Sequence, residues 1–301
     1  MNTVIKGVLL TPFNVLYRIS PRIELKLFFL LRMRRRLNLD NPGSYTEKLQ
    51  WLKLNDSQEN YRLMESLSDK YLAREYVSRL SGGYDILNTL YWHGFDPDAI
   101  PYDDLPDQFV IKVTHGATFN IIVRDKAGLD RGKASKLLKK WLSVKYLVCY
   151  GEKWYGRVRP RVIVEKYLEN RATGELVDYK VHCFNGRAKL IVVYSERFEA
   201  LKSNVYDREW NLLDVKFAYP KGKDVEKPEC LEELIAVAEK LSEDFIYVRI
   251  DFYILDNKIV FGEYTFTQAA GYNRIEPHSF DLEMGSWINL PEKGGVRNVV
   301  F

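Results

Sequence analysis

VRIDFYILDNKIVFGEYT, residues 248–265, predicts a β-hairpin whose two faces differ chemically. A three-residue loop at 256–258 suits this hairpin, because Asn257 tolerates the left-handed backbone that such loops need. One face is then apolar and the other carries the charged side chains. The register places these pairs directly opposite one another: Asp251 and Glu263, Arg249 and Thr265, Tyr253 and Phe261.

Two carboxylates are close together on the polar face. Directly opposed side chains in an antiparallel pair stand about 5 Å apart. Asp251 and Glu263 repel one another at that separation unless a cation lies between them, and hard carboxylate oxygens suit Mg²⁺ or Mn²⁺. The neighbouring Arg249 adds a guanidinium fork that suits phosphate. The alternative is a solvated surface hairpin in which Arg249 neutralises both acids, and the hairpin alone does not decide between the two.

A second hairpin is predicted at 109–123, FVIKVTHGATFNIIV. Its first strand contains a lone Lys112, and its loop at 114–120 is small and polar, with Gly116 and Thr118. One ammonium group and the backbone N–H groups of such a loop can surround phosphate oxygens. Many strands end in an exposed lysine, however, so this pattern alone is a weak indication.

A polar bend follows the apolar stretch RVIVEKYL at 161–168. A hinge of this kind can offer backbone donors and acceptors to the edge of a purine. It can equally be an edge strand that enters a loop. The order of the segments along the chain is more informative than any one of them.

That order resembles the ATP-grasp superfamily. D-alanine–D-alanine ligases have similar residues at 249–252, RIDF, and at 165–166, EK. Over most of its length the chain looks closer to the TupA-like ATP-grasp proteins of cell-surface polysaccharide loci. The segments that carry this resemblance are NPGSYTEK at 41–48, DKY at 69–71, DYKVHCFNG at 178–186, YDREW at 206–210 and GEYTFT at 262–267.

The resemblance implies an α+β fold of antiparallel sheets with flanking helices and ATP between two subdomains. It implies that Lys70 and Lys112 contact the α- and β-phosphates beneath the loop of Gly116 and Thr118. Asp251 and Glu263 would hold Mg²⁺ or Mn²⁺, and Arg249 would steady the transferred γ-phosphoryl group. Two departures from the family pattern are visible: Thr265 stands where D-alanine ligases have Asn, and the phosphate loop has only one glycine.

The resemblance also implies an adenosine site. Glu165 would accept from the adenine amino group, while the backbone of Lys166, Tyr167 and Leu168 would read the ring edge. Asp178 and Glu169 are both candidates for the ribose, and Lys180 is a further candidate for binding the nucleotide.

The reaction implied by the resemblance is amide formation through an acyl phosphate. An amino acid would be joined to a sugar carboxylate, such as a uronic acid, of a bacterial surface polysaccharide or its precursor. Arg274 and His278 would orient the acceptor carboxylate, although both can be ordinary surface residues. The main alternative is a glycosyltransferase, for which Asp96 and Asp98 offer an Asp-x-Asp pair. A non-catalytic nucleotide-binding protein is a third.

The bulk composition favours one compact enzyme. The chain has 301 residues, of which 46% are hydrophobic, which excludes a disordered protein. Its three cysteines lack a Cys-x-x-Cys pair and its four histidines lack ligand spacing, so we expect a reducing, cytoplasmic setting and no zinc site. We expect four parts: a basic amphipathic segment at 1–45, a helical subdomain at 46–107, a nucleotide-clamping subdomain at 108–170 and a metal and substrate subdomain at 171–301.

Positive charge is concentrated at the N-terminus. Residues 1–40 contain eight basic and two acidic side chains, a net +6, which leaves −2 for the rest of a chain of net +4. Residues 1–36 also contain apolar clusters too short to span a bilayer. They can lie on an anionic membrane surface, on the inner face of the bacterial cytoplasmic membrane, or pack as a helix on the core. Packing on the core is slightly favoured over binding to a membrane surface, and nucleic acid binding is not expected.

Local signals predict several further elements. Ser44 and Glu47 form a capping-box pattern that opens a helix. The other expected elements are a helix at 66–80, a loop at 91–107, a basic helix at 133–146, a hairpin at 178–194 that turns at Asn185-Gly186, and an amphipathic helix at 228–242.

Overall fold

The structure, a computed structural model, describes residues 3–116, 118–146, 148–170, 176–195 and 201–291, with only the backbone of residues 3–9. The helices are α1 (Thr3–Ile19), α2 (Pro21–Met33), α3 (Tyr45–Asn55), α4 (Gln58–Ser68), α5 (Leu72–Leu80), α6 (Arg131–Leu142), α7 (Leu231–Ser242) and α8 (His278–Ser286). Short 3₁₀ turns are η1 (Pro97–Ala99), η2 (Tyr102–Asp104), η3 (Val148–Tyr150), η4 (Lys153–Gly156) and η5 (Gln268–Gly271).

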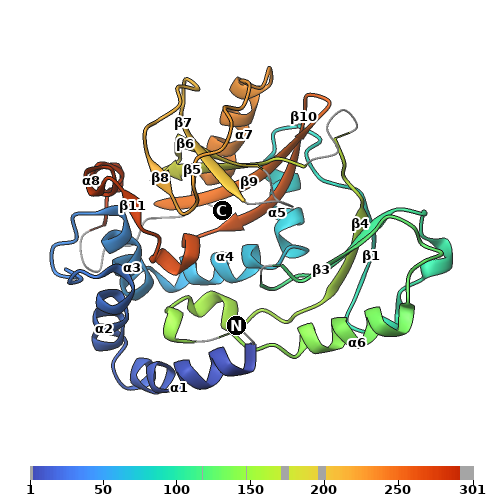
Figure 1. Ribbon diagram of the computed structural model, residues 1–301, viewed down its shortest axis with the longest axis horizontal. Coiled ribbons are helices and arrows are strands. Elements are labelled where there is room, and N and C mark those ends of the chain that lie inside the picture. The colour runs from blue at the N-terminus through green and yellow to red at the C-terminus, as the bar shows by residue number, and fades with distance from the viewer. Residues whose placement is uncertain (1–2, 117, 147, 171–175, 196–200, 292–301) are drawn as a thin grey trace.

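The strands form two larger antiparallel sheets and a small one. The four-stranded sheet has the order β1-β4-β2-β3, from Leu90–Gly94, Val162–Lys166, Phe109–Val113 and Asn120–Val123. The five-stranded sheet has the order β10-β9-β5-β6-β7, from Lys258–Thr265, Tyr247–Leu255, Asp178–Phe184, Arg187–Ser195 and Lys202–Asp207. β8 (Lys216–Phe217) pairs with β11 (Ile275–Glu276). The predicted α+β architecture is confirmed (Figure 1).

Both faces of the five-stranded sheet are covered. Alternate side chains such as Val181 and Ile250 belong to a core shared with α7, and α7 lies over this sheet in Figure 1. On the other face, Phe184 and Tyr247 pack with buried side chains of α2, α3 and α8. Lys180, Arg249 and Asp251 share this second face and are buried, whereas Glu263 on the same face is 34% exposed.

The hairpin of β9 and β10 has the predicted charged pairs but a different turn. Asp251 is opposite Glu263, and Arg249 is opposite Thr265. The turn has two residues, Asp256 and Asn257, both with positive φ, and not three. A bulge at Gly262 restores the predicted register for the residues that follow it. A Cβ atom at position 262 would lie 2.9 Å from the Asp251 carbonyl oxygen. Before this bulge Phe261 pairs with Phe252, so the predicted pair with Tyr253 is wrong.

Two other local predictions are corrected. The segment 91–107 is not a plain loop, because β1 pairs with β4 there and η1 and η2 follow. The four-stranded sheet therefore draws on residues that the sequence placed in the helical subdomain. The helix at 66–80 is also interrupted: Asp69 ends α4, and its Oδ1 accepts from the backbone N–H groups of Tyr71 and Leu72 to start α5.

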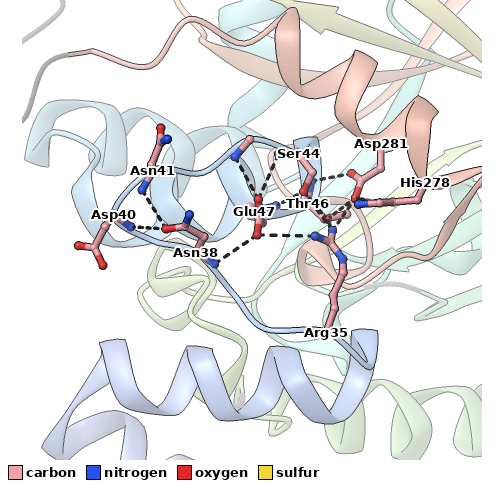
Figure 2. A network of polar contacts seen from close by, with 10 residues as sticks. Arg35, Asn38, Asp40, Asn41, Ser44, Thr46, Glu47, His278 and Asp281 are labelled. Atoms are coloured by element: carbon pink, nitrogen blue, oxygen red, sulfur yellow. Dashed lines mark hydrogen bonds and ion pairs between the residues drawn. The ribbon is translucent and has the colours of Figure 1, made fainter.

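The start of α3 is built as predicted. Ser44 and Glu47 each accept from the other's backbone N–H group, which is a complete capping box. Arg35 donates to Asp281 of α8 at 2.6 Å, and Asp281 also accepts from the Thr46 backbone at 3.0 Å (Figure 2). This network ties the segment after α2 to the C-terminal helix.

The inward face of α2 belongs to the core. Leu25, Phe28, Phe29 and Met33 are buried, so the core interpretation holds for this face. Within the described residues, every helix is too short or too polar to span a bilayer. All three cysteines are buried and are not joined in disulfides.

Glu24, also on α2, is fully buried, and neither of its carboxylate oxygens has a hydrogen-bond partner among the described residues. Burial raises the pKa of Glu24 to about 8, with the charge of Lys53 acting in the opposite direction. The native state therefore keeps a proton that the unfolded chain loses above its ordinary pKa. Stability should fall as pH rises toward the native pKa.

Glu24→Gln should remove this dependence, because a carboxamide does not titrate. We expect the variant to gain melting temperature over the wild type at about pH 7.5 and to gain little at about pH 5. Thermal melting at the two pH values measures this. The control is Asp40→Asn, because the Asp40 carboxylate is exposed. An equal shift in melting temperature at both pH values in Glu24→Gln would contradict a protonated Glu24 in the native state.

Candidate functional site

A cavity of about 820 Å³ opens where the two larger sheets meet α4, α5 and the end of α6. It is lined by side chains that include Leu67, Lys70, His115, Phe119, Trp141, Tyr146, Tyr155 and Thr267. Four cationic side chains, Lys70, Lys140, Lys145 and Arg249, line it with two carboxylates, Glu152 and Glu263. Its size suits a small-molecule ligand, and its excess of cations favours an anionic one.

Beside the cavity wall, Asp251 is the centre of a buried ion cluster. Arg249 Nε donates to Asp251 Oδ1 at 2.6 Å, and Arg249 Nη2 donates to Oδ2 at 2.8 Å. Lys180, directly opposite on β5, donates to Oδ2 at 2.5 Å. Burial alone would raise the pKa of Asp251, but these two cations outweigh it and hold the pKa below its ordinary value.

Glu263 faces the cavity in a more open setting. Its side chain is 34% exposed, its Oε2 lies 3.0 Å from Lys70 Nζ, and its Oε1 lies 3.8 Å from Arg249. Burial tends to raise the pKa of Glu263, yet Lys70 and Arg249 lower it below the ordinary value despite the nearby charge of Asp251. The ammonium group of Lys70 thus links Glu263 on β10 to the turn between α4 and α5.

The turn between α4 and α5 orients Lys70. Asp69 is 1% exposed and its Oδ2 accepts from Thr114 Oγ1 at 2.8 Å. Lys70 also donates from Nζ to the Gly116 carbonyl at 3.2 Å, and its backbone N–H donates to the Thr114 carbonyl at 3.3 Å. The lysine is thereby fixed beside the loop of the β2–β3 hairpin, as a phosphate clamp requires.

The two carboxylates predicted to hold Mg²⁺ differ in accessibility. Glu263 presents its oxygens to the cavity, whereas the Asp251 side chain is 5% exposed with both oxygens bonded to cations. Within the described part of the chain, no three His, Cys, Asp or Glu side chains cluster as a metal site would. The two carboxylates Asp251 and Glu263 would suit Mg²⁺ that is held by one or two carboxylates together with phosphate oxygens. Asp251 would have to release Lys180 or Arg249 to take part.

The predicted adenine residues lie on the four-stranded sheet and away from the cavity lining. Glu165 Oε2 accepts from Lys112 at 2.7 Å, and its Oε1 accepts from Arg74 at 2.9 Å. The Lys166 backbone is also engaged: its N–H donates to the Thr89 carbonyl at 2.9 Å, and its carbonyl accepts from the Asn88 side chain at 2.9 Å. Lys112 and Glu165 are thus brought together as a pair, and a purine would compete with existing bonds at Lys166.

Other predicted residues are scattered. Asp178 and Lys180 are buried on β5, Thr118 is exposed with positive φ, and Tyr167 accepts from Arg124 at 3.2 Å, while Leu168 is half-buried. None of these is among the side chains that line the cavity within the described residues.

The predicted acceptor-binding residues are also outside the cavity lining. Arg274 donates to the Arg32 carbonyl at 3.1 Å. His278 Nδ1 lies 3.6 Å from Asp281 in the network of Figure 2, with its side chain 55% exposed. Arg274 thus contacts the end of α2, and His278 contacts a residue of its own helix α8, which does not favour a role of either in orienting the acceptor.

Three charged residues of the cavity lining were not predicted as site residues. Lys140 is on α6 and Lys145 follows the end of this helix, and their charge was the only available signal. Glu152 precedes η4 as an isolated acid, and nothing in its sequence surroundings indicates a site. Arg74, which neutralises Glu165, was likewise not predicted, because it occupies an ordinary position on the exposed face of a helical pattern.

The Asp-x-Asp pair of the glycosyltransferase alternative is used structurally. Asp96 accepts from the Asp98 backbone N–H at 3.0 Å to begin η1. The Asp98 carboxylate accepts from Ser135 and pairs with Lys139, both on α6. Neither acid lines the cavity, so the pair anchors a loop to α6.

A comparison with solved structures finds many similar chains, among them the following three enzymes, all at low identity. D-alanine–D-alanine ligase from Bacillus anthracis complexed with ATP is 15% identical with a TM-score of 0.40, over 68% of this chain and 56% of that one. D-alanine–D-alanine ligase from Helicobacter pylori is 16% identical with a TM-score of 0.42, over 83% and 70%. N5-carboxyaminoimidazole synthase from Aspergillus clavatus in complex with ADP and 5-aminoimidazole ribonucleotide is 14% identical with a TM-score of 0.43, over 73% and 50%.

These coverages mean that the chain spans little more than half the length of the Bacillus anthracis ligase and half that of the Aspergillus clavatus synthase. No curated protein matches the chain. A comparison with protein families, in contrast, matches residues 47–289 to the family described as TupA-like ATPgrasp. This match includes both larger sheets and the whole cavity lining. The chain therefore belongs to the TupA-like ATP-grasp family.

Proposed function

We propose that the protein is an ATP- and Mg²⁺-dependent carboxylate–amine ligase that works through an acyl phosphate. The observation that carries this proposal is the convergence of Lys70, Arg249 and Glu263 on one cavity, which lies between the five-stranded sheet and the β2–β3 loop. Cations and a cavity-facing carboxylate on the same wall suit a triphosphate and its metal ion. ADP and ATP complexes among the similar structures agree with this ligand.

The residues would act by positioning and by charge. Lys70 would leave Glu263 for a phosphate oxygen, which frees the Glu263 carboxylate to hold Mg²⁺. Arg249, fixed by Asp251 and Thr265, would stabilise charge on the γ-phosphoryl group as a substrate carboxylate attacks it. Bound Mg²⁺ would neutralise the phosphoryl oxygens. No general base is needed for this first step, because the attacking carboxylate is already an anion.

Phosphorus NMR of a reaction that contains a uronic-acid glycan and a mixture of amino acids tests the proposal. We expect ADP and inorganic phosphate, with phosphate release that depends on the amino acids. ATP with Mg²⁺ should also raise the melting temperature, since a hundredfold excess over Kd adds about 2.7 kcal/mol to stability. Reactions without amino acid, without glycan and with a chelator are the controls.

Three outcomes would overturn the proposal in different ways. Pyrophosphate and AMP would indicate an adenylating enzyme. Release of UDP from a sugar donor, with stabilisation by UDP-sugars and not by ATP, would favour a glycosyltransferase. ATP binding without turnover across all glycans and amino acids would favour a non-catalytic nucleotide-binding protein.

The substrate class is part of the same proposal. Resemblance to TupA-like proteins of surface polysaccharide loci supports an amino acid as the amine and a uronic acid of a bacterial glycan as the carboxylate. Three buried cysteines outside any disulfide support a cytoplasmic location. A glycan precursor assembled at the membrane would then be met at the inner face of the cytoplasmic membrane.

An exposed stripe on the N-terminal helices supports such a membrane contact. Ile23, Leu27, Leu30 and Leu31 are 40–59% exposed on α2, and their spacing puts them on one helix face. Val15 and Ile19 on α1 are also exposed. Exposed basic side chains of the same segment are Arg18, Arg22, Lys26, Arg32, Arg34 and Arg36. An apolar stripe bordered by cations suits an anionic lipid surface.

Cosedimentation with lipid vesicles measures this contact. The full chain should sediment with vesicles that contain phosphatidylserine, remain in solution with phosphatidylcholine alone and be released by high salt. Combined Ile23→Ser, Leu27→Ser and Leu31→Ser should weaken binding about tenfold or more. The same change at Leu212 and Leu282, exposed elsewhere, is the control. Unchanged binding of the triple variant would place the contact, if any, outside this stripe.

A further inference from the structure

One cavity carboxylate has no part in the phosphoryl chemistry described above. Glu152 is 7% exposed and lines the cavity. Its Oε1 accepts from Thr267 Oγ1, and its Oε2 accepts from the Tyr146 hydroxyl. Because these donors come from different segments of the chain, they hold the carboxylate in one orientation. A rigid buried carboxylate in a ligand-sized cavity is a recognition group rather than a solvated surface acid.

Glu152 also lacks a bonded cation. The other carboxylate in the cavity lining, Glu263, is paired with Lys70. Within the described segments, no Lys or Arg nitrogen forms an ion pair with Glu152. The charge of Lys53 acts on it, but Lys53 donates to neutral acceptors, the Gln50 side chain and the Tyr150 and Ala270 carbonyls, at 2.6–3.0 Å. Buried carboxylates are stabilised by a cation, and here a ligand is free to supply it.

The location of Glu152 identifies which part of the ligand it would meet. Thr267 follows Glu263 and Thr265 in the segment that leaves β10, so the Glu152–Thr267 bond lies at the phosphoryl end of the cavity. The adenine candidate Glu165 is on the other sheet and already neutralised by Arg74 and Lys112. A group bound at Glu152 would therefore lie beside Thr267, on the side of the cavity that carries Glu263 and Thr265.

We propose that Glu152 binds the ammonium group of the amine substrate and accepts one of its protons. The ammonium site stands on the geometry of the cavity, whereas the proton transfer rests on the proposed ligase function. Transfer converts the ammonium to a neutral amine and the carboxylate to a carboxylic acid. The nitrogen lone pair then forms the C–N bond, the C–O bond to phosphate breaks, and the departing phosphate takes the second proton of the nitrogen.

The surroundings of Glu152 agree with this role. Burial raises the pKa of Glu152, although Lys53 and the hydroxyls of Thr267 and Tyr146 act in the opposite direction. A carboxylate whose pKa is raised accepts a proton more readily near neutral pH. The other titratable groups near it are the phenols of Tyr146, Tyr155 and Tyr272, and burial raises the pKa of each well above its ordinary value. Of the charged groups that act on Glu152, Lys53 has its own pKa lowered to about 8 by burial.

Ligand binding tests the ammonium site without any turnover. Each of the twenty amino acids and its N-acetyl derivative would be added singly to the protein with Mg²⁺ and a non-hydrolysable ATP analogue. We expect at least one free amino acid to raise the melting temperature and its N-acetyl derivative to have no effect. Glu152→Gln should lose this shift, while Tyr146→Phe, which keeps the carboxylate, should retain most of it. Equal shifts from free and acetylated amino acids, or a full shift in Glu152→Gln, would overturn the proposal.

Hydroxylamine separates the proton transfer from acyl phosphate formation. It is an uncharged nucleophile at neutral pH and traps acyl phosphates as hydroxamates without a proton acceptor. Glu152→Gln should lose amino-acid-dependent phosphate release at least about a hundredfold and recover turnover with hydroxylamine. No hydroxamate from the wild type would count against the proposed function, and the ammonium site would then stand or fall on the binding test alone. Failure of hydroxylamine to restore turnover in Glu152→Gln, with a wild type that forms hydroxamate, would overturn the proton-transfer role.

Discussion

Replacing Asp251 by Asn is expected to lower the free energy of unfolding by about 3–5 kcal/mol, the usual cost of removing one partner from a buried ion pair. Asp251 is the shared anion of Arg249 and Lys180, and its side chain is 5% exposed. The substitution leaves two buried cations side by side. A sequence argument gives the opposite sign, because Asp251 and Glu263 alone would repel one another and the loss of either charge would relieve the repulsion.

Chemical denaturation near neutral pH measures this difference. Since the native pKa of Asp251 is below its unfolded value, its stabilisation is complete above about pH 4 and disappears as pH falls through the native pKa. The variant should therefore approach the wild type on acidification. Adding Lys180→Met to Asp251→Asn should recover part of the loss by removing one unpaired cation. Stability of Asp251→Asn within about 0.5 kcal/mol of the wild type would contradict the ion cluster.

The parts of the fold that the sequence predicted are those with local causes. The β9–β10 pair and the capping box at Ser44 depend on residues within a few positions of each other. The break at Asp69 was missed because the apolar periodicity of α4 and α5 continues across it. The bulge at Gly262 was missed because its extra residue compensates for a turn that is one residue shorter than predicted. The charged pairs are therefore the same with or without the bulge and the shorter turn.

The partners of the charged residues could not be predicted in the same way. Lys180 meets Asp251 because β5 is the neighbour of β9, and a sheet order that joins strands about seventy residues apart has no local signal. Arg74 on α5 and Glu165 on β4 are 91 residues apart in the sequence and meet only in the folded chain. Glu152 is an isolated acid in a loop, and only the folded chain places it beside Thr267. The charged residues themselves could therefore be predicted from the sequence better than the partners that they contact in the folded chain.

Glu263→Gln should leave the fold intact and slow the reaction strongly. Its side chain is 34% exposed and its partner Lys70 is 21% exposed, so water can solvate Lys70 after the change and the pair contributes little to stability. We expect a melting temperature close to that of the wild type. The carboxylate nevertheless lies where the proposed metal ion would neutralise the transferred phosphoryl group, and loss of one such preorganised charge typically slows turnover about 10²–10³-fold.

The rate of ADP formation at saturating ATP, measured over a range of Mg²⁺ concentrations, tests this expectation. Glu263→Gln should need more Mg²⁺ for half-maximal rate and remain slow at saturation, because the amide oxygen is a neutral and weaker ligand. Glu276→Gln, an exposed glutamate that pairs with Lys216, should behave as the wild type. If Glu263→Gln instead turned over at the wild-type rate with the same Mg²⁺ dependence, the carboxylate would be only a partner of Lys70, and the metal ion would have to be held by phosphate oxygens and Asp251.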